Sequence, residues 1–267
     1  MVSVDVEEDL RSDNEKTFEG VENLDKILNI FENYNIQSTL FVKGEVMENY
    51  PDLVLKWSKK HEISCHGNCH IIDRSKSYVK RYMLSKQERE KQLKDFCELY
   101  GDLFGTKPKG FRAEEFTIDQ LQLKLLEKFG FEYDSSVLSN YPFFIKNVGY
   151  KGKAPEMPYH PSYSNYREKG DMRILEIPFT TLAFGFPLSG TWIRVLGTKF
   201  YKFLLALKKP RFIGLMLHSW DCIEYEYKYS RNSGERFLEY LDDILENLEK
   251  RNYSFVRGEL YAEGREA

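Results

Sequence analysis

The sequence lacks the features that mark several specialised classes of protein. No run approaches the roughly 18 consecutive apolar residues that a membrane-spanning helix requires. The opening stretch MVSVDVEEDL has neither the basic nor the apolar segment of a secretory signal. Lysine and arginine number 39 against 42 aspartates and glutamates, so there is no basic excess to neutralise nucleic-acid phosphates. We therefore expect a cytoplasmic protein with no membrane span and no nucleic-acid partner.

Cysteine is also scarce. The four cysteines, Cys65, Cys69, Cys97 and Cys222, are too few and too unevenly spaced for a disulfide framework. A chain of 267 residues with 42% apolar content can bury a sizeable core without such cross-links. Its length suits a single domain spanning residues 1–267.

What the chain does have is a regular alternation of short β-rich segments with amphipathic helical ones. The expected strands are residues 2–6, 38–44, 62–67, 109–113, 131–136, 173–180 and 212–218. The expected helices are residues 18–35, 52–60, 84–105, 118–130, 191–211 and 233–252. This order predicts parallel βαβ units, and the leading architecture is a distorted (β/α) barrel of seven or eight strands, with a doubly wound sheet as second choice. Residues 138–172 break the alternation and predict a long loop insertion.

Ionisable residues stand where five of the expected strands end: Asp5, His66, Arg112, Asp134 and His218. Any one of them would be unremarkable. In a barrel, however, catalytic residues lie at the carboxyl ends of the strands. The joint pattern therefore predicts a functional site at one rim of the barrel.

The stretch EISCHGNCH is the densest group of chemically capable side chains. Haem attachment fails because it requires C-x-x-C-H, and a closed zinc site fails because no second ligand pair is present. If the chain is helical after the strand, His66 and His70 share one face and can share one metal ion. Two histidines at this spacing are about as often structural as ligating, and it is the nearby carboxylates that favour the metal. Cys65 and Cys69 are most simply small buried apolar residues.

The motifs SVDVEED, HEISCHGNCH, GFRAEEF, YDSS and LMLHSWD occur in the order and rough spacing of the NodB-homology polysaccharide deacetylases, carbohydrate esterase family 4. The chain resembles this family over most of its length, and most closely a branch with a D-V-E first motif and an H-G-x-x-H second motif. The resemblance implies a metal-dependent hydrolase that removes N-acetyl groups from a sugar or glycan, free or lipid-linked. It also implies one divalent ion, first of all Zn²⁺, with Co²⁺, Ni²⁺ and Mn²⁺ as alternatives.

Carried over by position, the resemblance gives Asp5 as the general base, Arg112 as the residue that holds it, and His218 as the general acid. His66 and His70 match the two metal-binding histidines.

Several positions depart from the family pattern. Val6 stands where a second aspartate is usual, so the third metal ligand is expected to be Glu7, with Glu8 as the alternative. Glu114 replaces a proline, and substrate is expected to contact the chain near Glu115. The second aspartate of the D-S-x-D-W motif is missing. Asp134 or Asp221 is therefore expected to orient His218.

Aromatic residues complete the expected site. Trp220 and Tyr141 are predicted to stack on sugar rings, although aromatics more often fill cores. The basic amphipathic segment 191–211 is expected in the outer layer of the barrel, with a membrane surface as the less favoured interpretation. Two alternative functions stay open. One is an allantoinase-like or deformylating amidohydrolase with the same metal site, and the other is a non-catalytic glycan-binding barrel.

Overall fold

A seven-stranded parallel sheet organises the molecule. The computed structural model describes residues 1–10, 16–67, 84–140, 153–226 and 230–264. Its strands follow the order β6-β5-β4-β3-β2-β1-β7, and each pairs in parallel with its neighbours. The strands are β1 (Val2–Val6), β2 (Thr39–Val42), β3 (Glu62–Cys65), β4 (Gly110–Phe111), β5 (Tyr133–Asp134), β6 (Leu175–Glu176) and β7 (Leu215–His218).

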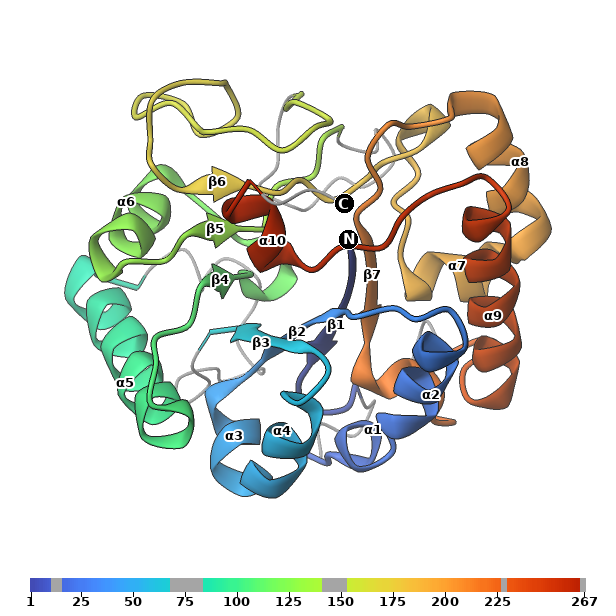
Figure 1. Ribbon diagram of the computed structural model, residues 1–267, viewed down its shortest axis with the longest axis horizontal. Coiled ribbons are helices and arrows are strands. Elements are labelled where there is room, and N and C mark those ends of the chain that lie inside the picture. Colours follow the sequence, from blue (N-terminus) through green and yellow to red (C-terminus); the bar gives the residue numbers. More distant parts are fainter. Residues whose placement is uncertain (11–15, 68–83, 141–152, 227–229, 265–267) are drawn as a thin grey trace.

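The sheet curls into a half-barrel surrounded by helices, which confirms the predicted fold class (Figure 1). Each of the seven segments expected to be strands contains one of the observed strands. The edge strands β6 and β7 are bridged by irregular backbone, where Thr180 donates to the Gly214 carbonyl and Met216 donates to that of Leu188. The strands are almost entirely buried because helices cover the outer face and side chains fill the inner one.

Most helices lie in the expected segments with some subdivision, whereas two, at residues 44–49 and 258–262, lie outside them. The α-helices are α1 (Glu19–Glu22), α2 (Asp25–Asn33), α3 (Gly44–Asn49), α4 (Pro51–Trp57), α5 (Lys86–Phe104), α6 (Gln120–Phe129), α7 (Gly190–Leu196), α8 (Thr198–Lys208), α9 (Glu235–Glu249) and α10 (Gly258–Ala262). Short 3₁₀ turns are η2 (Glu114–Phe116), η3 (Ala183–Gly185) and η4 (Ser219–Cys222). The single helix expected at 191–211 is two helices, because Gly197 between them has φ +84°.

Local sequence signals explain the helix ends. Ser85 and Glu88 form a reciprocal capping box at the start of α5, and Gly105 ends that helix in the left-handed conformation. Asp119 caps α6 by accepting from the Gln122 amide, and Gly130 ends it with φ +88°. The predicted beginning and end of the 118–130 helix are therefore confirmed.

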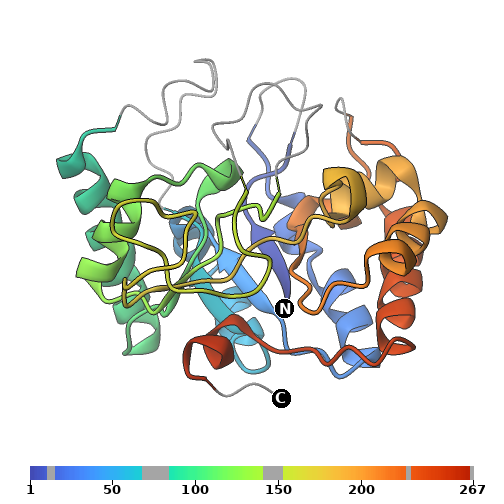
Figure 2. The same ribbon diagram turned by 90° about the horizontal axis from the view of Figure 1, so that it is seen from above.

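The amino-terminal end of the half-barrel is closed by a buried carboxyl. Glu62 accepts hydrogen bonds from Tyr133 Oη (2.6 Å), Ser64 Oγ (2.8 Å), Thr39 Oγ1 (2.8 Å) and the Glu259 amide (3.0 Å). The last bond fixes α10 across this end, where Figure 2 shows it near the amino terminus. Because this end is covered, the opposite end remains for a functional site.

Part of the expected loop insertion is described. Residues 153–172 have irregular backbone with isolated bridges, such as Pro161 to Lys169, whereas residues 141–152 lie outside the described part. None of the helices in the described ranges is long and apolar enough to cross a membrane.

Candidate active site

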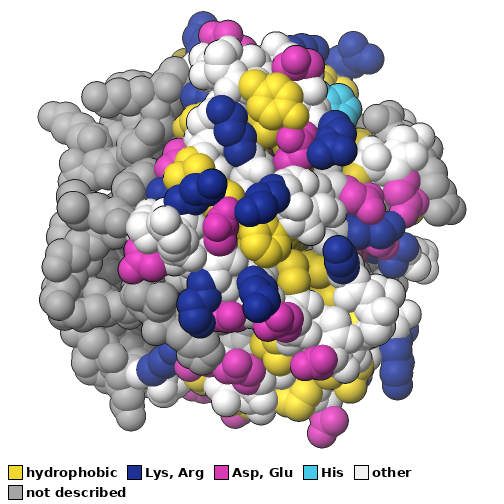
Figure 3. All heavy atoms as spheres, turned by 90° about the vertical axis from the view of Figure 1, so that its left-hand side faces the viewer, with side chains coloured by type: hydrophobic (Ala, Val, Ile, Leu, Met, Phe, Trp, Pro, Cys, Tyr) yellow, Lys and Arg dark blue, Asp and Glu magenta, His cyan; other side chains and the backbone are white. Residues whose placement is uncertain are grey.

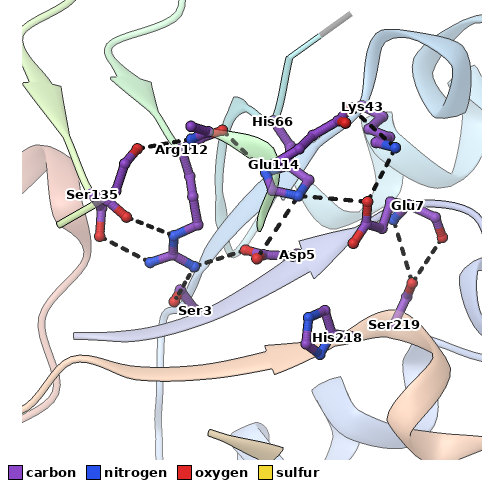
Figure 4. A network of polar contacts seen from close by, with 12 residues as sticks. Ser3, Asp5, Glu7, Lys43, His66, Arg112, Glu114, Ser135, His218 and Ser219 are labelled. Atoms are coloured by element: carbon purple, nitrogen blue, oxygen red, sulfur yellow. Dashed lines mark hydrogen bonds and ion pairs between the residues drawn. The ribbon is translucent and has the colours of Figure 1, made fainter. Parts of the chain in front are cut away.

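The carboxyl ends of four strands, β1, β3, β4 and β7, bring together four of the side chains predicted to form the site. Asp5 on β1 is in register with His218 on β7. His66 directly follows β3, and Arg112 directly follows β4. Figure 4 shows Asp5, His66 and Arg112 in one polar network at this rim, with His218 next to it.

Arg112 holds Asp5 in place. Its Nη1 donates to Asp5 Oδ1 (2.7 Å) and to Ser3 Oγ (2.9 Å), while its other nitrogens donate to the backbone oxygen and Oγ of Ser135, both at 2.9 Å. The guanidinium also lies over the Phe41 ring, 4.1 Å from its centre. With both partners almost fully buried, the Asp5 carboxylate is fixed in orientation and only its Oδ2 faces the histidine.

His66 is oriented so that one nitrogen faces two carboxylates. Its Nδ1 lies 3.1 Å from the Arg112 carbonyl oxygen and donates a hydrogen bond to it. Its Nε2 lies 3.8 Å from Asp5 Oδ2 and 3.7 Å from Glu7 Oε2. A backbone carbonyl on one nitrogen is the usual arrangement that leaves the other nitrogen available to a metal ion.

Lys43, which directly follows β2, is buried among three carboxylates. Its Nζ lies 3.1 Å from Glu7 Oε2, 2.8 Å from Glu8 Oε2 and 3.1 Å from Glu114 Oε1. Both oxygens of Glu8 accept from this ammonium, whereas Glu7 also faces His66. Of the two candidates for the third ligand, Glu7 is therefore the one positioned for it.

The cluster is rich in charge. Among the described residues, four carboxylates (Asp5, Glu7, Glu8 and Glu114) lie around two cations (Lys43 and Arg112) and His66.

The pKa values of the cluster respond to the same charges. Burial alone would lower the pKa of His66, but Asp5 and Glu7 outweigh it and raise that pKa. Burial alone would raise the pKa of Glu7, but Lys43 and His66 hold it well below the ordinary value.

The described ligands fit a divalent metal ion. His66 Nε2 and Glu7 Oε2 are 3.7 Å apart, and two atoms each about 2 Å from one ion have a comparable separation. The third predicted ligand, His70, lies outside the described residues. Within the described residues, no three His, Cys, Asp or Glu side chains form a metal site by themselves. The donor set of imidazole and carboxylate is typical of catalytic zinc.

His218, at the end of β7, has two neighbouring residues on the η4 turn, Trp220 and Asp221. Its ring stacks on that of Trp220, with centres 4.3 Å apart and planes 12° apart. Asp221 Oδ2 accepts from the His218 amide (2.9 Å) and lies 3.8 Å from its Nδ1. Asp221 is itself bonded to buried Arg194 (2.9 Å). Of the two predicted orienting carboxylates, Asp221 is the one beside His218.

Two of the predicted roles are corrected by these placements. Asp134 does not orient His218, because its carboxyl bonds to Ser136 Oγ (2.6 Å) and pairs with Glu176. Trp220 is only 5% exposed, so most of its ring contacts His218 and the core instead of a sugar.

The buried pair of Asp134 and Glu176 predicts a pH dependence of stability. Burial raises the pKa of both carboxyls, and the charge of Asp134 helps to raise that of Glu176 well above 4.5. A folded state that binds more protons than the unfolded state loses stability as pH rises through this window. The free energy of unfolding should fall by up to about 1.4 kcal/mol per pH unit for this carboxyl above roughly pH 4.5. Urea denaturation at several pH values should show that Glu176→Gln removes this slope, whereas exposed Glu132→Gln keeps it. The prediction would be contradicted if the free energy of unfolding changed with pH in the same way in the wild type and in Glu176→Gln.

The loop after Arg112 has a strained backbone at the rim. Glu115 and Phe116 have φ +51° and +55°, values that non-glycine residues rarely adopt. Such strain clusters at functional sites, and Glu115 is exposed there as the predicted contact with substrate requires. Tyr141, the other predicted substrate contact, lies outside the described residues.

Three residues of the site region were not predicted from the sequence: Lys43, Glu176 and Arg194. Each is a charged side chain within or directly beside an apolar segment, as in TLFVKG and RILEIPF. A fully buried charge needs a partner, and this signal would have identified them as members of a polar cluster.

Comparison with known proteins agrees with this geometry. Residues 13–133 match the model of the polysaccharide deacetylase family. A peptidoglycan deacetylase of Helicobacter pylori is 29% identical over 132 residues, which make up 48% of this chain and 42% of the relative. The match thus spans less than half of that relative.

Solved structures share the fold. A peptidoglycan N-acetylglucosamine deacetylase superposes with a TM-score of 0.56 at 15% identity, covering 96% of this chain and 84% of the other. A family 4 carbohydrate esterase pseudoenzyme from Bacillus anthracis superposes with a TM-score of 0.55 at 12% identity, covering 98% and 64%. The chain is thus similar to polysaccharide deacetylases over residues 13–133, and its half-barrel is the fold of these solved structures.

Proposed function

We propose that the protein removes N-acetyl groups from a glycan in a reaction that depends on a divalent metal ion, first of all Zn²⁺. The observation that carries the proposal is the position of Asp5, whose Oδ1 is held by Arg112 and whose Oδ2 faces His66. The same geometry leaves Glu7 and His66 directed at one point. The described part of the site thus contains the proposed base with its arginine and two of the three proposed metal ligands. Retention of these groups favours an enzyme over a non-catalytic glycan-binding barrel.

His66 and Glu7, together with His70, would hold the ion. When bound, the ion supplies a Lewis acid for the amide carbonyl and makes water acidic enough to lose a proton near neutral pH. Asp5 Oδ2 accepts that proton, and Arg112 keeps the carboxylate oriented during the transfer. Lys43 keeps Glu7 in place beside His66.

His218 donates the proton that the leaving amine requires. It lies in register with Asp5 on the neighbouring strand, so the proposed acid and base are two separate side chains at the same rim. Its ring stacks on that of Trp220, and the Asp221 carboxylate that accepts from its backbone amide lies 3.8 Å from Nδ1. The site thus separates the proton acceptor from the proton donor, as amide hydrolysis requires.

The substrate class follows from the relatives. The curated relative and the solved enzyme are named as deacetylases of peptidoglycan and of its N-acetylglucosamine. We therefore propose an N-acetylglucosamine-containing glycan, free or lipid-linked, as the substrate. Purified protein reconstituted with zinc should release acetate from N-acetylglucosamine oligomers and should not open the ring of allantoin. Allantoin hydrolysis without acetate release would favour the amidohydrolase alternative.

His66→Ala should remove metal binding. The substitution deletes one of the proposed ligands and should weaken the zinc affinity of the purified protein by at least about a hundredfold. Equilibrium dialysis against zinc measures this directly. His160→Ala, on an exposed loop residue, is the matched control and should bind as the wild type does. Unchanged zinc affinity in His66→Ala would exclude His66 as a ligand.

A further inference from the structure

One segment of the chain has no acidic residue. Between Glu176 and Asp221 the sequence contains neither Asp nor Glu, although 42 of the 267 residues of the chain are acidic. The same segment contains six cations: Arg194, Lys199, Lys202, Lys208, Lys209 and Arg211. It comprises η3, α7, α8 and β7, so much of its charge lies on the outer helices beside α9 (Figure 1).

Helix α8 is apolar on two faces. Tyr201, Leu204 and Leu205 are buried in the core. Phe203 and Leu207, four residues apart on the outer face, are 59% and 55% exposed. The inner face holds the helix on the barrel, whereas Phe203 and Leu207 leave more than half of their surface to solvent.

The turn η3 adds a second exposed aromatic side chain. Phe184 is 65% exposed and has a backbone φ of +60°, which is costly for a bulky residue. Phe186, at the end of this turn, packs edge-on against Phe200 of α8 with ring centres 5.1 Å apart. The strained turn thus presents an aromatic ring to solvent beside α8.

Three exposed cations in this segment have no carboxylate partner among the described residues. Arg194, Lys202 and Lys208 are paired with carboxylates. Lys199, Lys209 and Arg211 are exposed and have no ion pair with any residue in the described ranges. By contrast, the face around α5 and α6 mixes both charges (Figure 3), with ion pairs such as Lys91 to Asp95. The positive charge is therefore confined to this segment, in a chain with a net charge of −3, because the neighbouring α9 is acidic and its Asp243 pairs with Lys202.

We propose that this surface docks the protein on an anionic lipid membrane. The docking surface consists of Phe184, Phe203, Leu207, Lys199, Lys209 and Arg211. Lipid headgroups of negative charge attract the three cations, and the two rings and the leucine enter the boundary between headgroups and acyl chains. Exposed phenylalanine and leucine with basic residues match that boundary better than they match nucleic acid, which the aliphatic side chain would not contact. This property is independent of the hydrolytic reaction and goes beyond it.

Vesicle co-sedimentation tests the proposal with the full chain. The wild type should sediment with vesicles of equal parts phosphatidylglycerol and phosphatidylcholine, and should stay in solution with vesicles of phosphatidylcholine alone. Replacing Phe203 and Leu207 by serine should lower partitioning onto the anionic vesicles at least about tenfold, because both substitutions remove apolar surface that enters the lipid boundary. Added salt should weaken the binding of the wild type.

A matched double variant controls for general surface changes. Leu55→Ser with Lys59→Gln alters one exposed leucine and one exposed lysine on and next to α4, and it should partition as the wild type does. Circular dichroism should show that both double variants are folded. Three results would overturn the proposal: no sedimentation of the wild type, unchanged sedimentation of the Phe203/Leu207 variant, or a wild-type dimer that this variant dissociates without any vesicle binding.

Discussion

Asp5→Asn should lower kcat for acetate release by about 10²–10⁴-fold while the protein keeps its metal. The amide has the same shape and its oxygen can still accept from Arg112, so the local structure should persist. What the variant loses is the carboxylate that takes the proton from water. His66 and Glu7 are untouched, and metal content measured on the same samples should equal that of the wild type.

The appropriate control is another aspartate that follows the same strand. Asp9 accepts from the amides of Glu19 (2.6 Å) and Gly20 (2.9 Å) at the start of α1, and so has a structural role. Asp9→Asn should lower stability by roughly 1 kcal/mol and leave kcat of the folded protein close to the wild-type value. An Asp5→Asn protein with bound metal and wild-type kcat would remove Asp5 from the role of base.

Lys43→Met should lower the free energy of unfolding by about 3–5 kcal/mol. The side chain of Lys43 is 2% exposed, and its removal leaves Glu7, Glu8 and Glu114 without the charge that faces all three. Methionine has a similar shape, so the loss would reflect charge rather than volume. Urea denaturation in the presence of a chelator measures the effect without a contribution from bound metal.

Two further variants test the cause of this loss. Lys43→Arg keeps the charge and should be clearly more stable than Lys43→Met. Lys60→Met removes an exposed ion pair with Glu32 and should cost no more than about 1 kcal/mol. A Lys43→Met protein as stable as Lys60→Met would show that the buried cluster does not depend on its lysine.

Much of the fold could be predicted from the sequence because its signals are local. The alternation of apolar strands with amphipathic helices predicts a parallel barrel, and Asp119 and Gly130 mark the ends of one helix. The subdivision of 191–211 was missed because the sequence does not show that Gly197 has a positive φ and ends the first helix. Short α10 has no periodic pattern, and a tertiary bond to Glu62 fixes its position.

The candidate site could be predicted only in part. Strand ends identify Asp5, His66, Arg112 and His218, since parallel strands bring their carboxyl ends to one rim. Which carboxylate lies beside which histidine or cation depends on contacts between segments that are far apart in the sequence. No local sequence pattern reveals those contacts. Asp221 lies beside His218 because η4 follows β7 directly, whereas Asp134 lies on β5 and pairs with Glu176.

The role of Glu114 shows the same limit. In the sequence it is only a departure from the expected proline. In the structure it bonds to Lys43, which follows a different strand. Lys43, a buried lysine, and Glu114, which stands in place of a proline, therefore neutralise each other. Together with Glu7 and Glu8 they form the buried charge cluster.

Acetate release before and after metal removal tests the account most directly. Protein dialysed against a chelator should release no acetate from N-acetylglucosamine oligomers, and stoichiometric zinc should restore the activity. His66→Ala under the same zinc concentration should stay inactive. Acetate release at the wild-type rate from metal-free protein, or from His66→Ala, would contradict the claim that His66 and Glu7 hold a catalytic metal ion beside Asp5.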